Sequence, residues 1–168
     1  MTAVFVAAGS NVEPVANLRR ALDELARHYP RLRCSGTYRN RAVGFEGDDF
    51  LNLVLAFETD EDLHTVIGRL QAAEAACGRA REAPRWAPRA MDLDILLYGD
   101  LVRDEPGLVL PRPDLLRRAY MLGPMAELAP DFVHPVLGSS MRELWAAFDR
   151  GAHGMRPVEL GWHPGGRR

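Results

Sequence analysis

Hydrophobic and polar positions change their period along this chain, and the changes separate strands from helices. An apolar run at residues 3–8 is ended by Gly9-Ser10-Asn11, which is typical of a buried strand followed by a turn. From Pro14 to about His28, before Pro30, apolar residues recur at helical spacing and predict an amphipathic helix. The chain therefore opens with a strand, a turn and a helix.

Three later segments have the character of strands. Residues 31–38 alternate weakly, and residues 50–58 form a much stronger apolar run. Residues 92–98 form another apolar run, which ends at Gly99-Asp100. We expect all three to belong to the same sheet as the first strand.

A second helix is predicted between the last two of these strands. Apolar residues from 63 to 77 fall on one helical face together with Glu74, and Thr59 or Asp60 is the expected cap. The order is therefore strand, helix, strand, strand, helix, strand. It indicates an α+β fold with a ferredoxin-like βαββαβ core and a largely antiparallel sheet.

The last third of the chain is rich in proline and elaborates this core. We expect a short hairpin and two helices, near residues 119–128 and 141–148. No linker or internal repeat divides the sequence. The prediction is one domain over residues 1–160 and a flexible tail over residues 161–168.

Composition narrows the chemistry. The 168 residues carry a net charge of −2, which does not favour nucleic acid or a membrane surface as the partner. All 21 basic residues are arginine, so neither a lysine phosphate loop nor a Schiff-base lysine is present. Cys34 and Cys77 lack metal-ligand spacing and are expected to be free thiols. Without a basic leader or a membrane-length apolar stretch, we expect a cytoplasmic protein.

Two carboxylates at the start of a strand are the first candidate site. Asp92 and Asp94 lie two residues apart, so strand alternation places both on one face and Leu93 on the other. Mg²⁺ binds one or two such carboxylates and completes its shell with water and phosphate oxygens. The pair, taken alone, is more often two solvated acids at the entrance of a strand.

The segment before these aspartates is rich in arginine. Arg79, Arg81, Arg85 and Arg89 carry fork-shaped donors that suit a polyphosphate, although they could also form an ordinary solvent-facing loop. Trp86 lies among them and is either a packing anchor or an aromatic face for a ring. Together with the aspartates, this segment predicts magnesium-dependent phosphoryl transfer.

A second group of residues suits a planar heterocycle. Phe50 and Asn52 share one face of a strand, where a ring and an amide could bind a base. Alternatively, Phe50 belongs to the core and Asn52 satisfies local backbone, which is the favoured interpretation of these two residues alone. Arg117-Arg118 followed by Tyr120 is another phosphate-and-aromatic combination that is ambiguous alone.

Several of these segments resemble the 6-hydroxymethyl-7,8-dihydropterin pyrophosphokinases of folate biosynthesis. The resemblance extends from residue 3 to about residue 132. It is carried by Arg85-Trp86-Ala87-Pro88-Arg89-Ala90-Met91-Asp92-Leu93-Asp94-Ile95-Leu96, with Gly9-Ser10-Asn11, Tyr38-Arg39, Phe50-Leu51-Asn52, Glu74, Gly78-Arg79 and Arg118-Ala119-Tyr120-Met121-Leu122 in family order.

The resemblance implies a reaction and a set of roles. Pyrophosphate would pass from ATP to the pterin hydroxymethyl oxygen, leaving AMP, with two Mg²⁺ ions on Asp92 and Asp94. Catalytic roles would fall to Arg79, Arg89, Asp92, Asp94 and Arg118. The pterin would contact Asn40, Arg41, Val43, Phe50, Asn52, Trp86, Asp92 and Tyr120. The nucleotide would contact Gln71, Glu74, Arg81, Arg85, Trp86, Arg89, Ile95 and Arg112.

Some positions differ from the family pattern. Arg112 stands where the family usually has histidine, Gly107 and Val109 stand where some members have arginine and threonine, and Phe50 replaces a common tyrosine. The pterin enzyme is the leading hypothesis, with ATP and hydroxymethyldihydropterin as partners and a monomer as the expected state. The alternatives are a metal-dependent nucleotide hydrolase and a non-catalytic ferredoxin-like ligand-binding paralogue.

Overall fold

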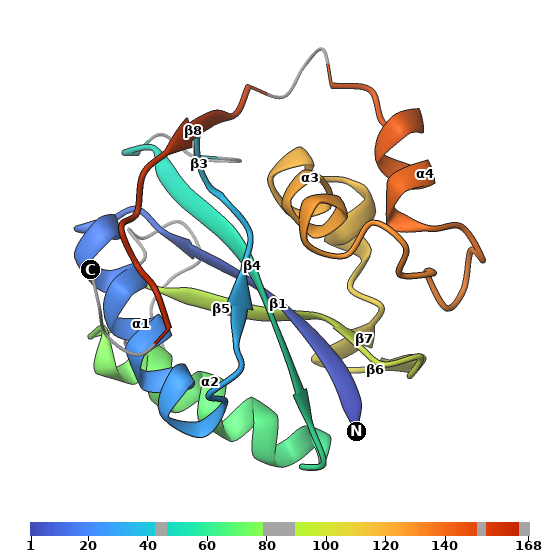
Figure 1. Cartoon of the computed structure of the whole chain (residues 1–168), viewed down its shortest axis with the longest axis horizontal. Helices are drawn as coiled ribbons and strands as arrows, with labels where there is room; N and C mark the ends of the chain where they lie inside the picture. Colours follow the sequence, from blue (N-terminus) through green and yellow to red (C-terminus); the bar gives the residue numbers. More distant parts are fainter. Residues whose placement is uncertain (43–46, 79–89, 151–153, 165–168) are drawn as a thin grey trace.

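The computed structural model of this chain describes residues 1–42, 47–78, 90–150 and 154–164. An antiparallel sheet with helices on both sides forms the body of the molecule (Figure 1). Its elements follow in the order β1 (Thr2–Ser10), α1 (Pro14–His28), β2 (Arg33–Cys34), β3 (Thr37–Asn40), β4 (Phe50–Thr59), α2 (Leu63–Ala76), β5 (Asp92–Tyr98), β6 (Arg103–Glu105), β7 (Leu108–Leu110), a 3-10 helix η1 (Pro113–Leu116), α3 (Ala119–Leu128), α4 (Met141–Ala147) and β8 (Arg156–Val158). The expected mixture of helices with an antiparallel sheet is confirmed.

The main sheet separates two hydrophobic cores. Its strand order is β5-β1-β4-β3-β8, β2 also pairs with β4, and every pairing is antiparallel. Alternate residues of a strand point to opposite faces. Accordingly, Val4 and Val6 of β1 join the core formed with α1 and α2, whereas Phe5 and Ala7 join the core formed with α3 and α4. Figure 1 shows these two helix pairs on opposite sides of the sheet.

The first helix has the predicted position. Pro14 lies in its first turn, where the missing N–H of proline costs no hydrogen bond. Leu18, Leu22 and Leu25 are buried against the sheet, as helical spacing requires. The turn before the helix is held by Asn17, whose Nδ2 donates to the carbonyl oxygen of Val12 at 2.6 Å.

Two details of the next elements differ from the prediction. The cap of α2 is Asp62, whose carboxylate accepts from Thr65 N at 2.8 Å, and neither Thr59 nor Asp60 has that role. The weak second strand is divided into β2 and β3. Between them, the Ser35 hydroxyl accepts from Val54 N at 2.9 Å, so a side chain interrupts the regular ladder to β4.

Two segments within residues 154–164 pack against earlier elements. β8 pairs with β3, and this added edge strand was not predicted. Trp162, inside the predicted tail, is only 9% exposed and donates from Nε1 to Asp23 on α1 at 2.8 Å. Trp162 thus packs against α1, with its indole N–H satisfied by a carboxylate of that helix.

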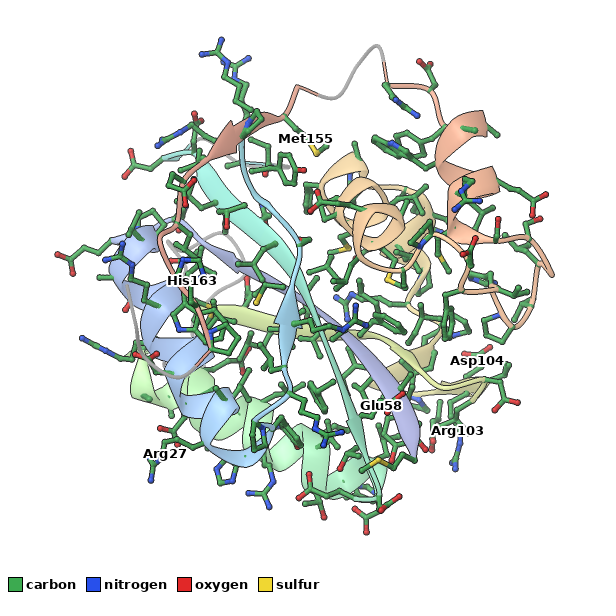
Figure 2. The ribbon with its side chains drawn as sticks, viewed as in Figure 1. Arg27, Glu58, Arg103, Asp104, Met155 and His163 are labelled. Carbon is green, nitrogen blue, oxygen red and sulfur yellow. The ribbon has the colours of Figure 1, made fainter. Side chains whose placement is uncertain are left out.

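The two C-terminal helices cover the second face of the sheet. Both lie where helical spacing predicted them, and α4 begins with a capping box between Ser140 and Glu143. Met155 lies on the side of α3 (Figure 2), and a Cβ atom on Gly123 of that helix would be 3.2 Å from its methyl carbon. The predicted hairpin is β6–β7, and Asp104 lies on its exposed side (Figure 2).

Candidate active site

One row of residues across the sheet brings distant parts of the sequence together. In the register of the strands, Asp92 on β5 lies opposite Gly9 on β1, Gly9 lies opposite Asn52 on β4, and Asn52 lies opposite Tyr38 on β3. Residues in such a row point to the same face of a sheet. Gly9 of this row lies two positions along β1 from Ala7, which belongs to the core with α3 and α4. The residues of the row therefore point to the face of the sheet that α3 covers.

Asp92 and Asp94 have the predicted arrangement. Asp94 lies opposite Ala7, so both carboxylates are on the α3 face and both are partly exposed. Leu93 points into the core with α1 and α2 and is 6% exposed. Its backbone N–H donates to Glu74 Oε2 on α2 at 2.9 Å, so the strand between the aspartates is tied to a helix on the opposite face.

Arg112 lies beside the second aspartate. Its backbone N–H donates to the carbonyl oxygen of Leu96 at 2.9 Å, which fixes residue 112 along the edge of β5. Its Nη1 lies 3.6 Å from Asp94 Oδ1, and its Nε lies 3.5 Å from Asp114 Oδ2. The side chains of Arg112, Asp94 and Asp114 are 37%, 35% and 35% exposed. This pair of carboxylates around one guanidinium was not predicted.

The start of α3 adds an aromatic ring and another arginine. Arg118 is the N-cap residue of α3, and Tyr120 lies in its first turn, packed against the core on that face. Burial raises the pKa of Tyr120, and Asp114 and Asp94 raise it further, while Arg118 and Arg112 oppose them. The hydroxyl of Tyr120 therefore shares the electrostatic environment of Asp94 and stays protonated at neutral pH.

Asn52 is a buried amide held by another amide. It is 7% exposed, and its Nδ2 donates to Oδ1 of Asn40 on β3. Asn40 in turn donates from Nδ2 to the carbonyl oxygen of Arg41 at 3.0 Å. Phe50, on the same face of β4, is only partly buried. Asn52 thus bonds another side chain, and Phe50 is not a fully buried core residue.

The remaining nucleotide-side candidates lie on the other side of β5. Ile95 belongs to the core with α1 and α2 and is 8% exposed. Gln71 and Glu74 lie on α2, which packs against that face of β5. The structure thus brings Asp92, Asp94, Asn52 and Tyr120 to one face and places these three around the opposite side of the same strand.

Part of the predicted site lies outside the described residues. These candidates are Val43, Arg79, Arg81, Arg85, Trp86 and Arg89. Among the residues that the structure describes, no group of three or more His, Cys, Asp or Glu side chains could hold a metal ion. The Asp92–Asp94 pair nevertheless fits Mg²⁺, because two hard oxygen ligands on one face suffice when phosphate and water supply the rest.

Sequence reasoning missed several contacts around the site. Gly9 is needed next to Asn52, since a Cβ atom there would lie 2.5 Å from Asn52 Oδ1. Glu127 of α3 accepts from the backbone N–H of Gly36 at 2.6 Å and from the Tyr38 hydroxyl, which connects α3 to β3 and the residue before it. These contacts join residues far apart in the chain, and only Gly9 carried a signal, as part of a turn motif.

None of the described helices has the length and apolar character needed to cross a membrane.

The fold and the site together define a class of protein: a mixed helix–sheet enzyme with an aspartate pair suited to magnesium and arginines suited to phosphate. Comparison with known proteins identifies the family within that class. Residues 5–130 match the model of 7,8-dihydro-6-hydroxymethylpterin-pyrophosphokinase, HPPK. The chain therefore belongs to the HPPK family, and it is an ATP-dependent pyrophosphokinase of folate biosynthesis.

Curated relatives and solved structures agree with this assignment. The chain is 35% identical over 164 residues to a 2-amino-4-hydroxy-6-hydroxymethyldihydropteridine pyrophosphokinase of Synechocystis sp., covering 96% of this chain and 83% of that protein. It is 40% identical over 149 residues to the enzyme of the same name from Pseudomonas aeruginosa, covering 86% and 90%.

A solved HPPK-DHPS protein of Plasmodium falciparum has the same fold, with a TM-score of 0.69 at 12% identity over 86% of this chain. A second solved HPPK-DHPS protein, in complex with substrates, gives a TM-score of 0.66 at 11% identity over 87% of this chain. This chain spans 45% and 43% of those longer proteins.

Proposed function

We propose that this chain transfers pyrophosphate from ATP to 6-hydroxymethyl-7,8-dihydropterin on the α3 face of the sheet, with Asp92 and Asp94 holding two Mg²⁺ ions. The observation that carries this proposal is the row across β5, β1, β4 and β3. It puts Asp92 on the same face as Asn52, with Gly9 between them, and Asp94 lies on that face opposite Ala7. A metal-bound phosphate and a flat heterocycle can therefore meet on one surface.

The pterin side of this surface is built from an amide and two rings. Asn52 is buried and oriented by Asn40, so it presents fixed hydrogen-bonding groups to the edge of a heterocycle. Phe50 and Tyr120, from β4 and α3, supply the aromatic faces. We assign the pterin to these residues and to Asp92, with Asn40, Arg41, Val43 and Trp86 as further contacts.

The nucleotide side lies around β5. We assign ATP to Gln71, Glu74, Arg81, Arg85, Trp86, Arg89, Ile95 and Arg112. Of these, Arg112 is the described guanidinium beside Asp94, so it can reach a phosphate that also touches the metal site. We assign a catalytic role to Arg79, Arg89 and Arg118, which would stabilise the negative charge that develops during transfer.

In the reaction, the hydroxymethyl oxygen forms a bond to the β-phosphorus of ATP, and the bond from that phosphorus to the bridging oxygen of the α-phosphate breaks. AMP leaves with that oxygen, and the hydroxymethyl proton passes to solvent. Asp92 and Asp94 would hold Mg²⁺, which would neutralise negative charge on the phosphate groups when bound. Asn52 and the rings of Phe50 and Tyr120 orient the pterin that accepts the pyrophosphate. Positioning of the two substrates therefore contributes most of the rate enhancement.

The proposal extends to the organisation of the protein. The strand order β5-β1-β4-β3 with α1 and α2 on one face supports a ferredoxin-like core. We further propose one pyrophosphokinase domain over residues 1–160, which acts as a monomer in the cytoplasm.

An assay with ATP, Mg²⁺ and hydroxymethyldihydropterin tests the reaction and the metal site together. We expect AMP and pterin pyrophosphate in equal amounts, and a loss of roughly a hundredfold in kcat for Asp92→Asn or Asp94→Asn. Asp104→Asn is the matched control, because Asp104 is exposed on the β6–β7 hairpin. Orthophosphate release without pterin would instead indicate a nucleotide hydrolase, and full activity of both aspartate variants would refute the metal assignment.

A further inference from the structure

Arg112 occupies an unusual position between two carboxylates. Nη1 approaches Asp94 at 3.6 Å and Nε approaches Asp114 at 3.5 Å, so one guanidinium is shared by a proposed metal ligand and by the first turn of η1. The backbone of Arg112 is fixed to β5 through the carbonyl oxygen of Leu96. The side chain of Arg112 can therefore change its partner while its backbone stays in place.

The shared arrangement is held by charge rather than by hydrogen bonds. The Nε atom of Arg112 is buried and has no hydrogen-bond partner among the described residues, although Asp114 lies 3.5 Å away. A buried donor without a hydrogen bond is unfavourable, and an ion pair at this exposure contributes little. The guanidinium can thus leave Asp94 at low cost when a stronger partner arrives.

A divalent cation on Asp94 would change the balance at this point. Asp94 would then interact with a charge of +2. The guanidinium of Arg112, whose Nη1 lies 3.6 Å from Asp94 Oδ1, would be repelled by that cation. A polyphosphate bound to the same cation offers Arg112 new oxygens within reach, in the fork geometry that a guanidinium favours.

We propose that Arg112 is a positioning residue that neutralises Asp94 while the metal site is empty and moves to the nucleotide phosphates when the metal and ATP bind. It therefore weakens the binding of the metal alone and strengthens the binding of the metal together with the nucleotide. This inference rests on the proposed metal site at Asp92 and Asp94.

Binding of Mn²⁺ without nucleotide tests the first half. Free Mn²⁺ is measured by electron paramagnetic resonance as the full chain is titrated. We expect Arg112→Gln to bind Mn²⁺ about twofold to fivefold more tightly than the unmodified chain, since a competing ion pair of this exposure is removed. Arg103→Gln, which removes an exposed arginine of the β6–β7 hairpin, should leave Mn²⁺ binding unchanged.

Binding of a nucleotide tests the second half. The probe is α,β-methylene-ATP at saturating Mg²⁺, because its carbon bridge replaces the oxygen that the reaction must release. Arg112→Gln should bind it at least threefold more weakly, whereas Arg103→Gln should bind it as the unmodified chain does. Opposite signs in the two measurements are the signature of a guanidinium that changes partner.

A double-mutant cycle guards against a general effect of charge. Asp114→Asn removes the second partner of Arg112, so the guanidinium should hold Asp94 more strongly and weaken Mn²⁺ binding. In the Arg112→Gln background, that effect should largely disappear. Circular dichroism of each variant confirms that it folds.

The outcomes separate this inference from the proposed function. If Mn²⁺ binding is lost in Asp94→Asn, the metal site stands and the Arg112 experiment is decisive. Equal or weaker Mn²⁺ binding in Arg112→Gln, or unchanged binding of the nucleotide analogue, would then overturn the inference. Mn²⁺ binding that does not depend on Asp92 and Asp94 would overturn the proposed metal site itself.

Discussion

The backbone of Gly9 lies directly against the side-chain amide of Asn52. The two residues are opposite each other in the β1–β4 register, and a Cβ atom built on Gly9 would lie 2.5 Å from Asn52 Oδ1 and 3.7 Å from the Phe50 ring. Glycine is needed here because any side chain would occupy the space of the amide. The close approach makes a backbone position part of the proposed pterin site.

Replacing Gly9 by alanine should damage pterin binding while leaving the metal site in place. The methyl group would push the Asn52 amide away from Asn40, so we expect pterin affinity to fall roughly tenfold. Calorimetric titration with the pterin measures this change, and Mn²⁺ binding should stay within twofold. Gly68→Ala is the control, since nothing lies within 4 Å of a Cβ atom at that position on α2. Unchanged pterin affinity in Gly9→Ala would remove Asn52 from the site.

The aspartate pair illustrates what sequence alone could establish. Alternation along a strand is a local property, so the shared face of Asp92 and Asp94 followed from their spacing, and the structure confirms it. The ends of α1 and α3 followed from helical spacing for the same reason. Local rules thus placed these elements, although they misplaced the cap of α2, which is Asp62 and neither Thr59 nor Asp60.

The partners of these aspartates depend on how distant elements pack. Glu74 bonds the backbone at Leu93 from a helix on the opposite face, and Arg112 reaches Asp94 only after the β6–β7 hairpin has returned the chain to β5. No periodicity encodes such contacts. The short strand β8 was missed because its three residues are too few to show a period, and its pairing with β3 supplies its register.

Glu74 offers a test of how the metal site is positioned. Its Oε2 accepts from Leu93 N at 2.9 Å, so Glu74→Ala would leave a donor of a buried residue without this partner and loosen the strand between the aspartates. We expect Mn²⁺ affinity without nucleotide to fall about threefold to tenfold. Glu74→Gln keeps an acceptor oxygen and should retain most of the affinity. Equal losses in both variants would point to the charge of Glu74 rather than to its hydrogen bond.

Tyr120 should contribute its ring rather than its hydroxyl. Burial raises the pKa of this tyrosine, so the hydroxyl remains protonated through the neutral range and does not act as a base. Tyr120→Phe should therefore keep pterin affinity within about threefold, whereas Tyr120→Leu, which removes the aromatic face, should weaken it by about tenfold. Equilibrium titration of the pterin compares the two variants. The pH–rate profile of Tyr120→Phe should have the same shape as that of the unmodified enzyme, and a lost limb would assign proton transfer to the hydroxyl.

His134 should make the fold sensitive to mild acid. It is 4% exposed, and its Nδ1 accepts from the backbone N–H groups of Val136 and Leu137, both at 3.2 Å. Burial lowers the pKa of His134 below its ordinary value of 6.5. Below pH 6.5 the unfolded chain therefore binds a proton that the folded chain resists. The stabilising contribution is complete above pH 6.5 and falls as the pH drops from there toward the folded-state pKa.

His134→Asn separates this contribution from the rest of the protein, because the Asn amide oxygen can replace Nδ1 as the acceptor but does not titrate. Melting temperatures between pH 7.5 and 5.5 measure the effect. The unmodified chain should lose up to about 1.4 kcal/mol per pH unit more than the variant over the part of this range below pH 6.5. If the melting temperatures of the two proteins fall equally as the pH drops, protonation of His134 does not destabilise the folded chain, and the prediction is wrong. If the variant is less stable than the unmodified chain at pH 7.5 but its stability falls less steeply below pH 6.5, the result still supports the role of His134. The reason is that the pH dependence of stability reports proton binding and the absolute stability does not.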